Sequence, residues 1–200
     1  MFYFKTSSLR KSINSQVAQR INNKEAGVTN TQVAIVVLVG VILLLGALGG
    51  YQYISQAKVN NEISMLSDMK AATVRYGQFA GTFNKDGTDL ATLHGLNFFA
   101  GAGLTVTGAG ATLQVGNQWG GTVVPAVGNV VAAGDSIAYT FTGVSTYACK
   151  ELGTKVDTIA SKVSINGEAT KLAGAHTLAA DVVANCAAGD NNTMLYTIAR

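Results

Sequence analysis

Proline is nearly absent from this sequence, which has only Pro125 against 23 glycines in 200 residues. Because the glycines follow no Gly-X-Y period, the composition excludes a collagen-like chain and predicts many tight turns between short strands. Charged side chains are also scarce, at 12% of residues against 48% apolar ones, which excludes an intrinsically disordered chain. The length predicts one strand-rich globular domain and an additional segment.

Cysteine is the next scarce residue, represented only by Cys149 and Cys186. A zinc site would need more ligands, and His94 and His176 have no ligand spacing with the cysteines. We expect the two cysteines to pair, which would stabilise the fold by roughly 4 kcal/mol in the chain-entropy model. The alternative is a pair of buried free thiols.

Motifs that carry catalysis are missing as well. The sequence has no phosphate-binding glycine loop, no metal-spaced histidine cluster and no nucleophile motif, and the GAG at residues 101–103 lacks the strand-then-helix setting of a dinucleotide site. We therefore expect neither enzymatic activity nor a cofactor or metal. His94 is interpreted as a loop or surface residue, and His176 as structural, with a binding role as the alternative. Trp119 is interpreted as a core or inter-subunit anchor, with an exposed ligand platform as the alternative.

The net charge of +3 is unevenly distributed along the chain. Residues 1–27 carry five basic side chains and one acidic side chain, a net charge of +4, and the remaining residues carry nine basic and ten acidic side chains, a net charge of −1. A basic flank directly before an apolar segment stays in the cytoplasm, so the rest of the chain should face outward, where disulfides persist. The pattern argues against a nucleic-acid-binding patch.

A long uncharged segment follows the basic flank. No charged residue occurs between Ala26 and Ala57, and the run from Val33 to Gly50 is eighteen apolar or glycine residues, enough to cross a bilayer. Helical spacing continues beyond it and predicts one helix over about residues 29–76, roughly 70 Å long at about 1.5 Å per residue. Its apolar side is expected to hold Val59, Ile63, Leu66, Met69, Thr73 and Tyr76. The charged residues should lie elsewhere on the wheel, namely Lys58, Glu62, Asp68 and Arg75.

Beyond Gly81 the sequence predicts a small antiparallel sheet. The composition turns to glycine, threonine, alanine and valine, with short alternating segments at 104–107, 111–115, 122–127, 137–142 and 193–198. A short helix is predicted over residues 146–161, although Gly153 weakens it. Asn166-Gly167 is the strongest hairpin signal in the chain.

The junction at Gly27 gives the N-terminal segment a specific interpretation. A basic leader, a glycine and then a long apolar helix resemble the N-terminus of a type IV prepilin. An ordinary secretory signal is cut after its apolar stretch, whereas the processing candidate here lies before it. The 27-residue leader, the non-aromatic Val28 and the remaining 173 residues resemble the type IVb class.

The C-terminal region resembles the PilS-type major pilins of plasmid- and island-borne thin pili. The resemblance rests on residues 149–152 (CKEL), 163–167 (VSING) and 185–189 (NCAAG), ahead of a closing strand. It implies the type IV pilin fold, an α+β architecture in which a long N-terminal hydrophobic helix packs on an antiparallel sheet, and a disulfide between Cys149 and Cys186. The implied parts are a leader at 1–27, a helix for membrane and filament core at 28–80 and a globular head at 81–200.

The resemblance also implies processing and assembly roles. A prepilin peptidase would cut between Gly27 and Val28 and methylate the new N-terminus at Val28. Type IV pilins usually have a glutamate at the fifth mature residue, where this chain has Gln32. Loss of that charge leaves a buried amine dependent on neutral acceptors, such as those of Thr29 and Gln32. The alternative is that Gln32 is merely a polar residue at the membrane interface.

The resemblance therefore implies a structural subunit of a type IVb pilus, a helical homo-oligomer built by an assembly platform and its ATPase. The prepilin would reside in the inner membrane and then join an extracellular filament for adhesion, conjugation or motility at host-cell or recipient-cell surfaces. Alternatives are a minor or tip pilin that binds a surface, receptor or DNA, and a type II secretion pseudopilin. Outside the family, the alternative is an exported protein cut near residues 47–49 by the ordinary signal peptidase.

Overall fold

The computed structural model describes residues 35, 37–41, 53–99, 103–187 and 189–200. The chain forms two compact units, Met1–Gln52 and Tyr53–Arg200. In the first unit the described residues are helical, and their large apolar side chains are 48% to 63% exposed. Among all described residues, no helix combines the length and hydropathy needed to cross a bilayer. Most of the apolar run at 33–50 lies outside the described residues.

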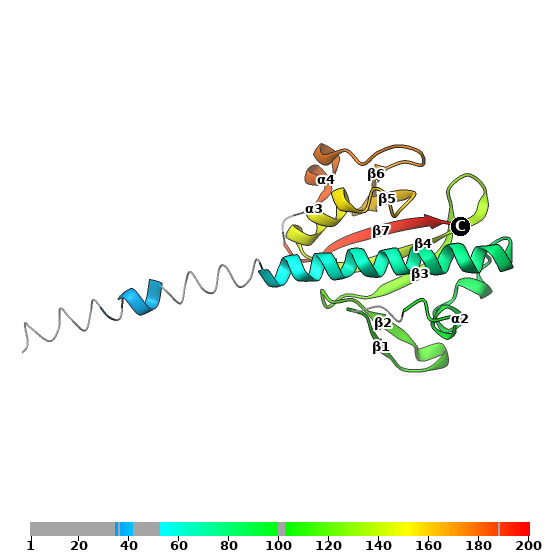
Figure 1. Cartoon of the computed structure of the whole chain (residues 1–200), viewed down its shortest axis with the longest axis horizontal. Helices are drawn as coiled ribbons and strands as arrows, with labels where there is room; N and C mark the ends of the chain where they lie inside the picture. The colour runs from blue at the N-terminus through cyan, green and yellow to red at the C-terminus, as the bar shows by residue number, and fades with distance from the viewer. Residues whose placement is uncertain (1–34, 36, 42–52, 100–102, 188) are drawn as a thin grey trace, which may run out of the picture. The chain divides into compact units, whose positions relative to one another are not determined.

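The second unit begins with a long helix over residues 53–80, which crosses the sheet in Figure 1. Its buried face repeats at helical spacing and includes Ser55, Val59, Glu62, Met65, Leu66, Met69, Ala72 and Thr73. The helix continues beyond Tyr76, where the predicted helical spacing ended, and its last helical residue is 80. The placement of Glu62 among the outward charges was wrong, because Glu62 follows Val59 by three residues and precedes Leu66 by four, which puts it on the buried face.

Gly81 ends the long helix, since it adopts a left-handed conformation with φ of 71° and its N–H bonds to the carbonyl oxygen of Gly77 (3.1 Å). Two short helices follow, η1 (Asp86–Thr88) and α2 (Leu90–Gly95), and neither was predicted from the sequence. The carboxylate of Asp89 caps α2 by accepting from the backbone N–H of Thr92 (2.9 Å).

Five antiparallel strands form the main sheet, in the order β3-β4-β7-β5-β6. Their bounds are Val123–Asn129 (β3), Ala133–Val144 (β4), Lys162–Ile165 (β5), Glu168–Lys171 (β6) and Asn192–Ala199 (β7). Ile137, Tyr139 and Phe141 of β4 are fully buried, and the hydroxyl groups of Tyr139 and Thr73 join the sheet to the long helix at 2.9 Å. The predicted architecture of a helix on an antiparallel sheet is confirmed for the described residues.

The turn between β5 and β6 is the predicted hairpin at Asn166-Gly167. Both residues have positive φ, 53° and 91°, as the tight hairpin turn requires. The prediction that all the strands belong to one sheet, in contrast, was wrong for the first two strands. Strands β1 (Thr105–Thr107) and β2 (Gln114–Gly116) form a separate two-stranded sheet, and η2 (Gly110–Thr112) covers the start of the strand predicted at 111–115.

Two helices flank the last strands. The helix α3 (Thr146–Lys155) starts at Ser145, whose hydroxyl accepts from the N–H of Ala148 (3.2 Å), and it is six residues shorter than predicted. The helix α4 (Ala179–Asn185) was not predicted. The contact between α3 and α4 explains why position 153 is a glycine, because a Cβ at this position would lie 2.6 Å from a methyl carbon of Val182 in α4. The glycine therefore allows α3 and α4 to pack closely.

Candidate functional site

The four residues predicted for processing and assembly, Gly27, Val28, Thr29 and Gln32, lie outside the described residues. Their roles remain predictions. The two cysteines and the residues around them lie within the second unit, which therefore supplies the geometry of the candidate site.

A disulfide joins Cys149 and Cys186, as predicted, with Cα atoms 5.9 Å apart and a sequence separation of 37. Cys149 is fully buried within α3, and Cys186 follows α4 and is 6% exposed. The alternative of two free thiols is thus wrong. The bond encloses residues 149–186, here called the disulfide-bounded segment, which contains most of α3 together with β5, β6 and α4.

A buried asparagine holds the end of this segment against the sheet. Asn192, at the start of β7, accepts from the N–H of Ala187 (2.8 Å) and from the amide of Asn166 (2.8 Å). Its own amide donates to the carbonyl oxygen of Val144 (3.2 Å). The amide of Asn166 also donates to the carbonyl oxygen of Asn185 (2.8 Å), beside the disulfide. Asn166 was predicted only as a turn residue, and Asn192 was not predicted, because two of its partners, Val144 and Asn166, lie far from it in sequence.

Asp157, in the loop after α3, joins this loop to the end of β6 and the loop that follows it. Its carboxylate accepts from Nδ1 of His176 (2.7 Å) and from the backbone and hydroxyl of Thr177 (2.8 and 3.0 Å), and it lies 3.2 Å from the ammonium of Lys171. The hydrogen bonds from His176, Thr177 and Lys171 hold the pKa of Asp157 well below its usual range. Lys171 is 7% exposed, and its ammonium also donates to the carbonyl oxygen of Ala160 (2.8 Å). The hydrogen bond of His176 to Asp157 is thus a structural contact that joins two loops.

A second polar cluster joins the long helix to the turn between β2 and β3. Glu62 is fully buried, and its Oε2 accepts from the indole N–H of Trp119 and from the amide of Gln118 (3.3 Å). The other oxygen, Oε1, has no hydrogen-bond partner. Burial raises the pKa of Glu62 to about 7, and the two hydrogen bonds offset only part of that effect.

The same turn also contacts Lys58, one helical turn before Glu62. Its ammonium donates to the carbonyl oxygen of Gln118 (3.1 Å) and lies 5.3 Å from the centre of the Trp119 ring. The amide of Gln118 donates to the carbonyl oxygen of Lys58 (2.5 Å). Trp119 is half-buried against the core and acts as an anchor on the helix, so it is not an exposed ligand platform.

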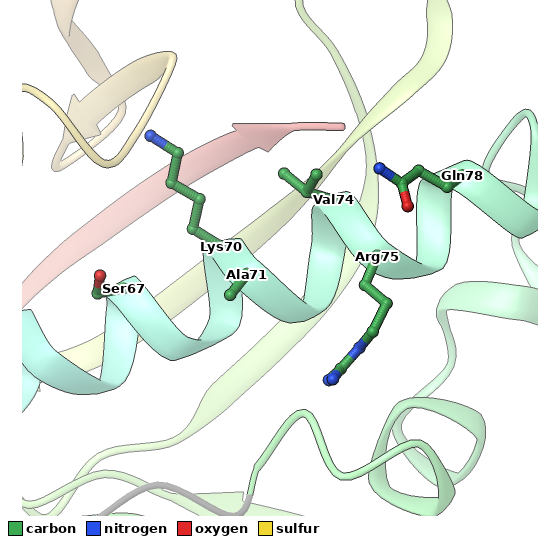
Figure 2. Close-up of a pocket in the computed structure, with 6 residues that line it drawn as sticks. All are labelled: Ser67, Lys70, Ala71, Val74, Arg75 and Gln78. Carbon is green, nitrogen blue, oxygen red and sulfur yellow. The ribbon is translucent and has the colours of Figure 1, made fainter.

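Two of the hollows along the long helix are wide and open. One, of about 470 Å³, is lined by Ser67, Lys70, Ala71, Val74, Arg75 and Gln78; Figure 2 shows Lys70 and Val74 pointing to one side of the helix and Arg75 to the other. The second, of about 510 Å³, lies between Lys70 and the disulfide-bounded segment. Lys70 lines both and donates to the carbonyl oxygen of Thr158 (2.7 Å). Their openness suits contact with another macromolecule better than enclosure of a small substrate.

A metal centre does not explain these clusters. Within the described ranges, His, Cys, Asp and Glu side chains nowhere gather in threes as metal ligands would. The polar groups of the second unit instead bind one another and hold its loops on the sheet and the long helix. The arrangement is that of a rigid body with an exposed surface.

Comparison with known proteins identifies relatives of this arrangement. A family model described as PilS N terminal matches residues 55–199. The crystal structure of a type IV b pilin from Salmonella typhi has a TM-score of 0.55 and 22% sequence identity, and the match covers 70% of this chain and 99% of that chain. TcpA, a type IV pilin from Vibrio cholerae El Tor biotype, has a TM-score of 0.47 and 13% identity, over 70% and 98% of the two chains. A search of curated proteins found no match.

Proposed function

Since the chain belongs to the PilS family of type IVb pilins, we propose that it is processed by a prepilin peptidase and polymerised through its N-terminal helix into an extracellular pilus. The family and the fold make it a structural subunit of a pilus. The proposal adds the route by which the subunit reaches the filament, and the uses of that filament in adhesion, conjugation or motility.

The observation that carries the proposal is the contrast between the two ends of the described chain. The second unit, residues 53–200, has a buried core and a disulfide. Ile35, Val37 and Leu38, in contrast, expose more than half of their surface on a helical segment that has no polar side chain in its described part. An apolar helical surface of this kind requires lipid or other helices around it. Residence in the inner membrane, followed by burial among copies of itself, supplies both environments.

In this proposal residues 1–27 are a leader that is removed, 28–80 the helix and 81–200 the head. The peptidase cuts between Gly27 and Val28, and Val28 is methylated. An assembly platform with its ATPase then moves subunits from the membrane into the filament. Exchange of lipid contacts for helix contacts lets the apolar segment avoid water throughout.

The assembly contact is proposed at Thr29 and Gln32, whose neutral oxygens would accept from the N-terminal amine of a neighbouring subunit. A buried amine without an anionic partner needs such acceptors. Gln32 also favours a second candidate function, a minor or tip pilin, because a tip subunit does not have to complete this contact with another copy. A tip subunit would then bind a host-cell or recipient-cell surface, or DNA. A secretion pseudopilin shares the same N-terminal features.

Mass spectrometry of purified pili tests the proposal. We expect an intact chain that begins with methylated Val28 and is the most abundant protein of the filament. A mature chain that starts near residue 50 would contradict processing at Gly27. Trace abundance in pili, with correct processing, would favour the tip subunit over the major subunit.

A further inference from the structure

Glu62 is buried without a full set of partners. Among the described residues, only two buried side-chain polar atoms lack a hydrogen-bond partner, the Oε1 atom of Glu62 and the hydroxyl oxygen of Ser136. An unsatisfied buried oxygen costs free energy, and the cost rises steeply when the group is charged. The neutral acid therefore costs less free energy in this site than the carboxylate does.

The groups that face Glu62 do not compensate a negative charge. Lys58, on the same helix, directs its ammonium to the carbonyl oxygen of Gln118 and the ring of Trp119, and in the described part of the chain no ion pair reaches Glu62. From the sheet, the titratable neighbour is Tyr196 of β7, whose pKa is raised by burial and by the charge of Glu62. Its hydroxyl donates to a methionine sulfur instead. From the turn, Gln118 and Trp119 supply neutral donors only.

The turn at residues 117–121 has a firm attachment to the sheet and a separate one to the helix. On the sheet side, the amide of Asn117 donates to the carbonyl oxygen of Thr142 (2.7 Å). Within the turn, the side-chain oxygen of Asn117 accepts from the N–H groups of Trp119 (2.9 Å) and Gly121 (3.0 Å). On the helix side, Gln118 and Trp119 make the contacts, and Glu62 lies beneath them. The side chains of Gln118 and Trp119 can thus leave the helix while the turn itself stays closed.

We propose that Glu62 is a proton-controlled latch between the long helix and the turn at residues 117–121. Protonated Glu62 keeps Gln118 and Trp119 docked on the helix. Loss of the proton draws water to the carboxylate, which displaces both side chains from the helix. The inference concerns the second unit alone and does not depend on the proposed function.

The direction of the pH dependence follows from the two protonation equilibria. The folded chain binds this proton with a pKa of about 7, against an ordinary value of 4.5. The folded state therefore holds the proton more tightly than the unfolded state does. The stabilising contribution is fully present below pH 4.5 and is lost as the pH rises through about 7. The latch is closed in mild acid and released above neutrality.

Trp119 is the only tryptophan of the chain, so its fluorescence reports directly on the latch. The experiment titrates the full-length protein in detergent micelles from pH 4 to pH 9. We expect a red shift of the emission with a midpoint near pH 7, as the indole gains water. Glu62→Gln, which keeps the shape and an acceptor for the indole, should remove this transition. The control Glu168→Gln, at an exposed position of β6, should leave the midpoint unchanged.

A flat wild-type titration, or the same midpoint in the Glu62→Gln variant, would overturn the proposal. A second measurement covers the case in which that variant fails to fold. In wild-type protein with ¹³C-labelled glutamate carboxyl groups, one resonance should titrate near pH 7. Titration of all glutamate carboxyls below pH 5 would equally overturn the latch.

Discussion

Two acidic side chains of the second unit, Asp157 and Glu62, differ in how their surroundings affect their protonation. Asp157 meets donors on His176 and Thr177 and the ammonium of Lys171, so its charge is stabilised. Glu62 has two neutral donors and one oxygen without a partner, so burial dominates and favours its neutral form. Both are carboxylic acids of similar intrinsic acidity. The number and charge of the donors around each group, and not the residue type, set its protonation.

Replacement of Asp157 tests the donor cluster. Asp157→Ala removes the acceptor shared by His176, Thr177 and Lys171, and it leaves the ammonium of Lys171, which is 7% exposed, without its carboxylate. We expect the free energy of unfolding at pH 7 to fall by about 1–3 kcal/mol, the usual cost of unsatisfied buried polar groups. Urea denaturation of the wild type and the variant measures the difference.

The pH dependence provides a second test of this cluster. Because the pKa of Asp157 is lowered in the folded state, its contribution is present above its ordinary value of 3.8 and is lost as the pH falls through the lower folded value. The stability gap between wild type and Asp157→Ala should therefore narrow in acid. Asp68→Ala, at an exposed position of the long helix, is the control and should show no such gap. A gap that is constant down to pH 2 would contradict the assigned role.

At the scale of elements, the pair formed by α3 and α4 depends on both a glycine and a disulfide. Both helices are short, with ten residues in α3 and seven in α4, and helices of this length are not stable alone. Gly153 allows close approach, and the bond between Cys149 and Cys186 fixes the far end of α4 to α3. Tertiary contacts therefore maintain these two helices.

Alanine substitutions at two glycines separate packing from helix propensity. Gly153→Ala improves intrinsic propensity by about 1 kcal/mol, but the new Cβ would meet Val182 at 2.6 Å. We expect net destabilisation by about 1–3 kcal/mol, as for other overpacked cores. Gly95→Ala in α2 has open space around its Cβ and should be neutral or stabilising. Thermal unfolding of both variants measures this, and equal melting temperatures would show that α3 and α4 separate without cost.

Removal of the disulfide should have a larger effect on the same elements. Cys149→Ser and Cys186→Ser each open a loop with a sequence separation of 37, for which we expect a loss of about 2–4 kcal/mol. Hydrogen exchange should show the loss first in α4, which has one buried residue, Val182. The reduced wild type is the matched control and should behave like the serine variants. Melting of both variants within a degree or two of the oxidised wild type would contradict this role of the bond.

The sequence predicted the elements that carry a local signal. Asn166-Gly167 specifies its hairpin because both residues accept positive φ, and the cysteine pair was found because only two cysteines occur. The helix α4 was missed because no side chain caps it and only Val182 is buried. Glu62 was predicted to face outward because its charge was given more weight than its helical spacing from Val59 and Leu66. The partners of Asp157, and two of those of Asn192, are distant in sequence, so no local pattern could identify these clusters.

At the scale of the whole molecule, the departure at Gln32 bears on filament assembly. In the proposed mature chain this amide replaces a carboxylate that would face an N-terminal amine of another subunit. A neutral acceptor forms a weaker bond than a charged one in a dry environment. In the proposed filament, helix packing and contacts between heads would therefore supply more of the cohesion.

Restoring the charge tests this interpretation. We expect Gln32→Glu to be processed normally and to give at least as many pili as the wild type, since a carboxylate opposite an amine forms a bond about twice as strong as a neutral one. Pili are counted by electron microscopy, with prepilin level and cleavage checked by blotting. Gln56→Glu, a similar charge change at an exposed position of the long helix, is the control. Full processing with few or no pili would mean that the carboxylate is buried unpaired.

The central position of β7 has a consequence for how the head is made. The β3–β4 and β5–β6 hairpins can each form as soon as their own residues are available, but β7 lies between β4 and β5 and pairs with both (Figure 1). Until residues 192–199 are available, the two hairpins remain separate, and each presents an unpaired edge to other chains. Incorporation of β7 then joins them into one sheet, so a subunit that has not yet incorporated its last strand is prone to aggregation.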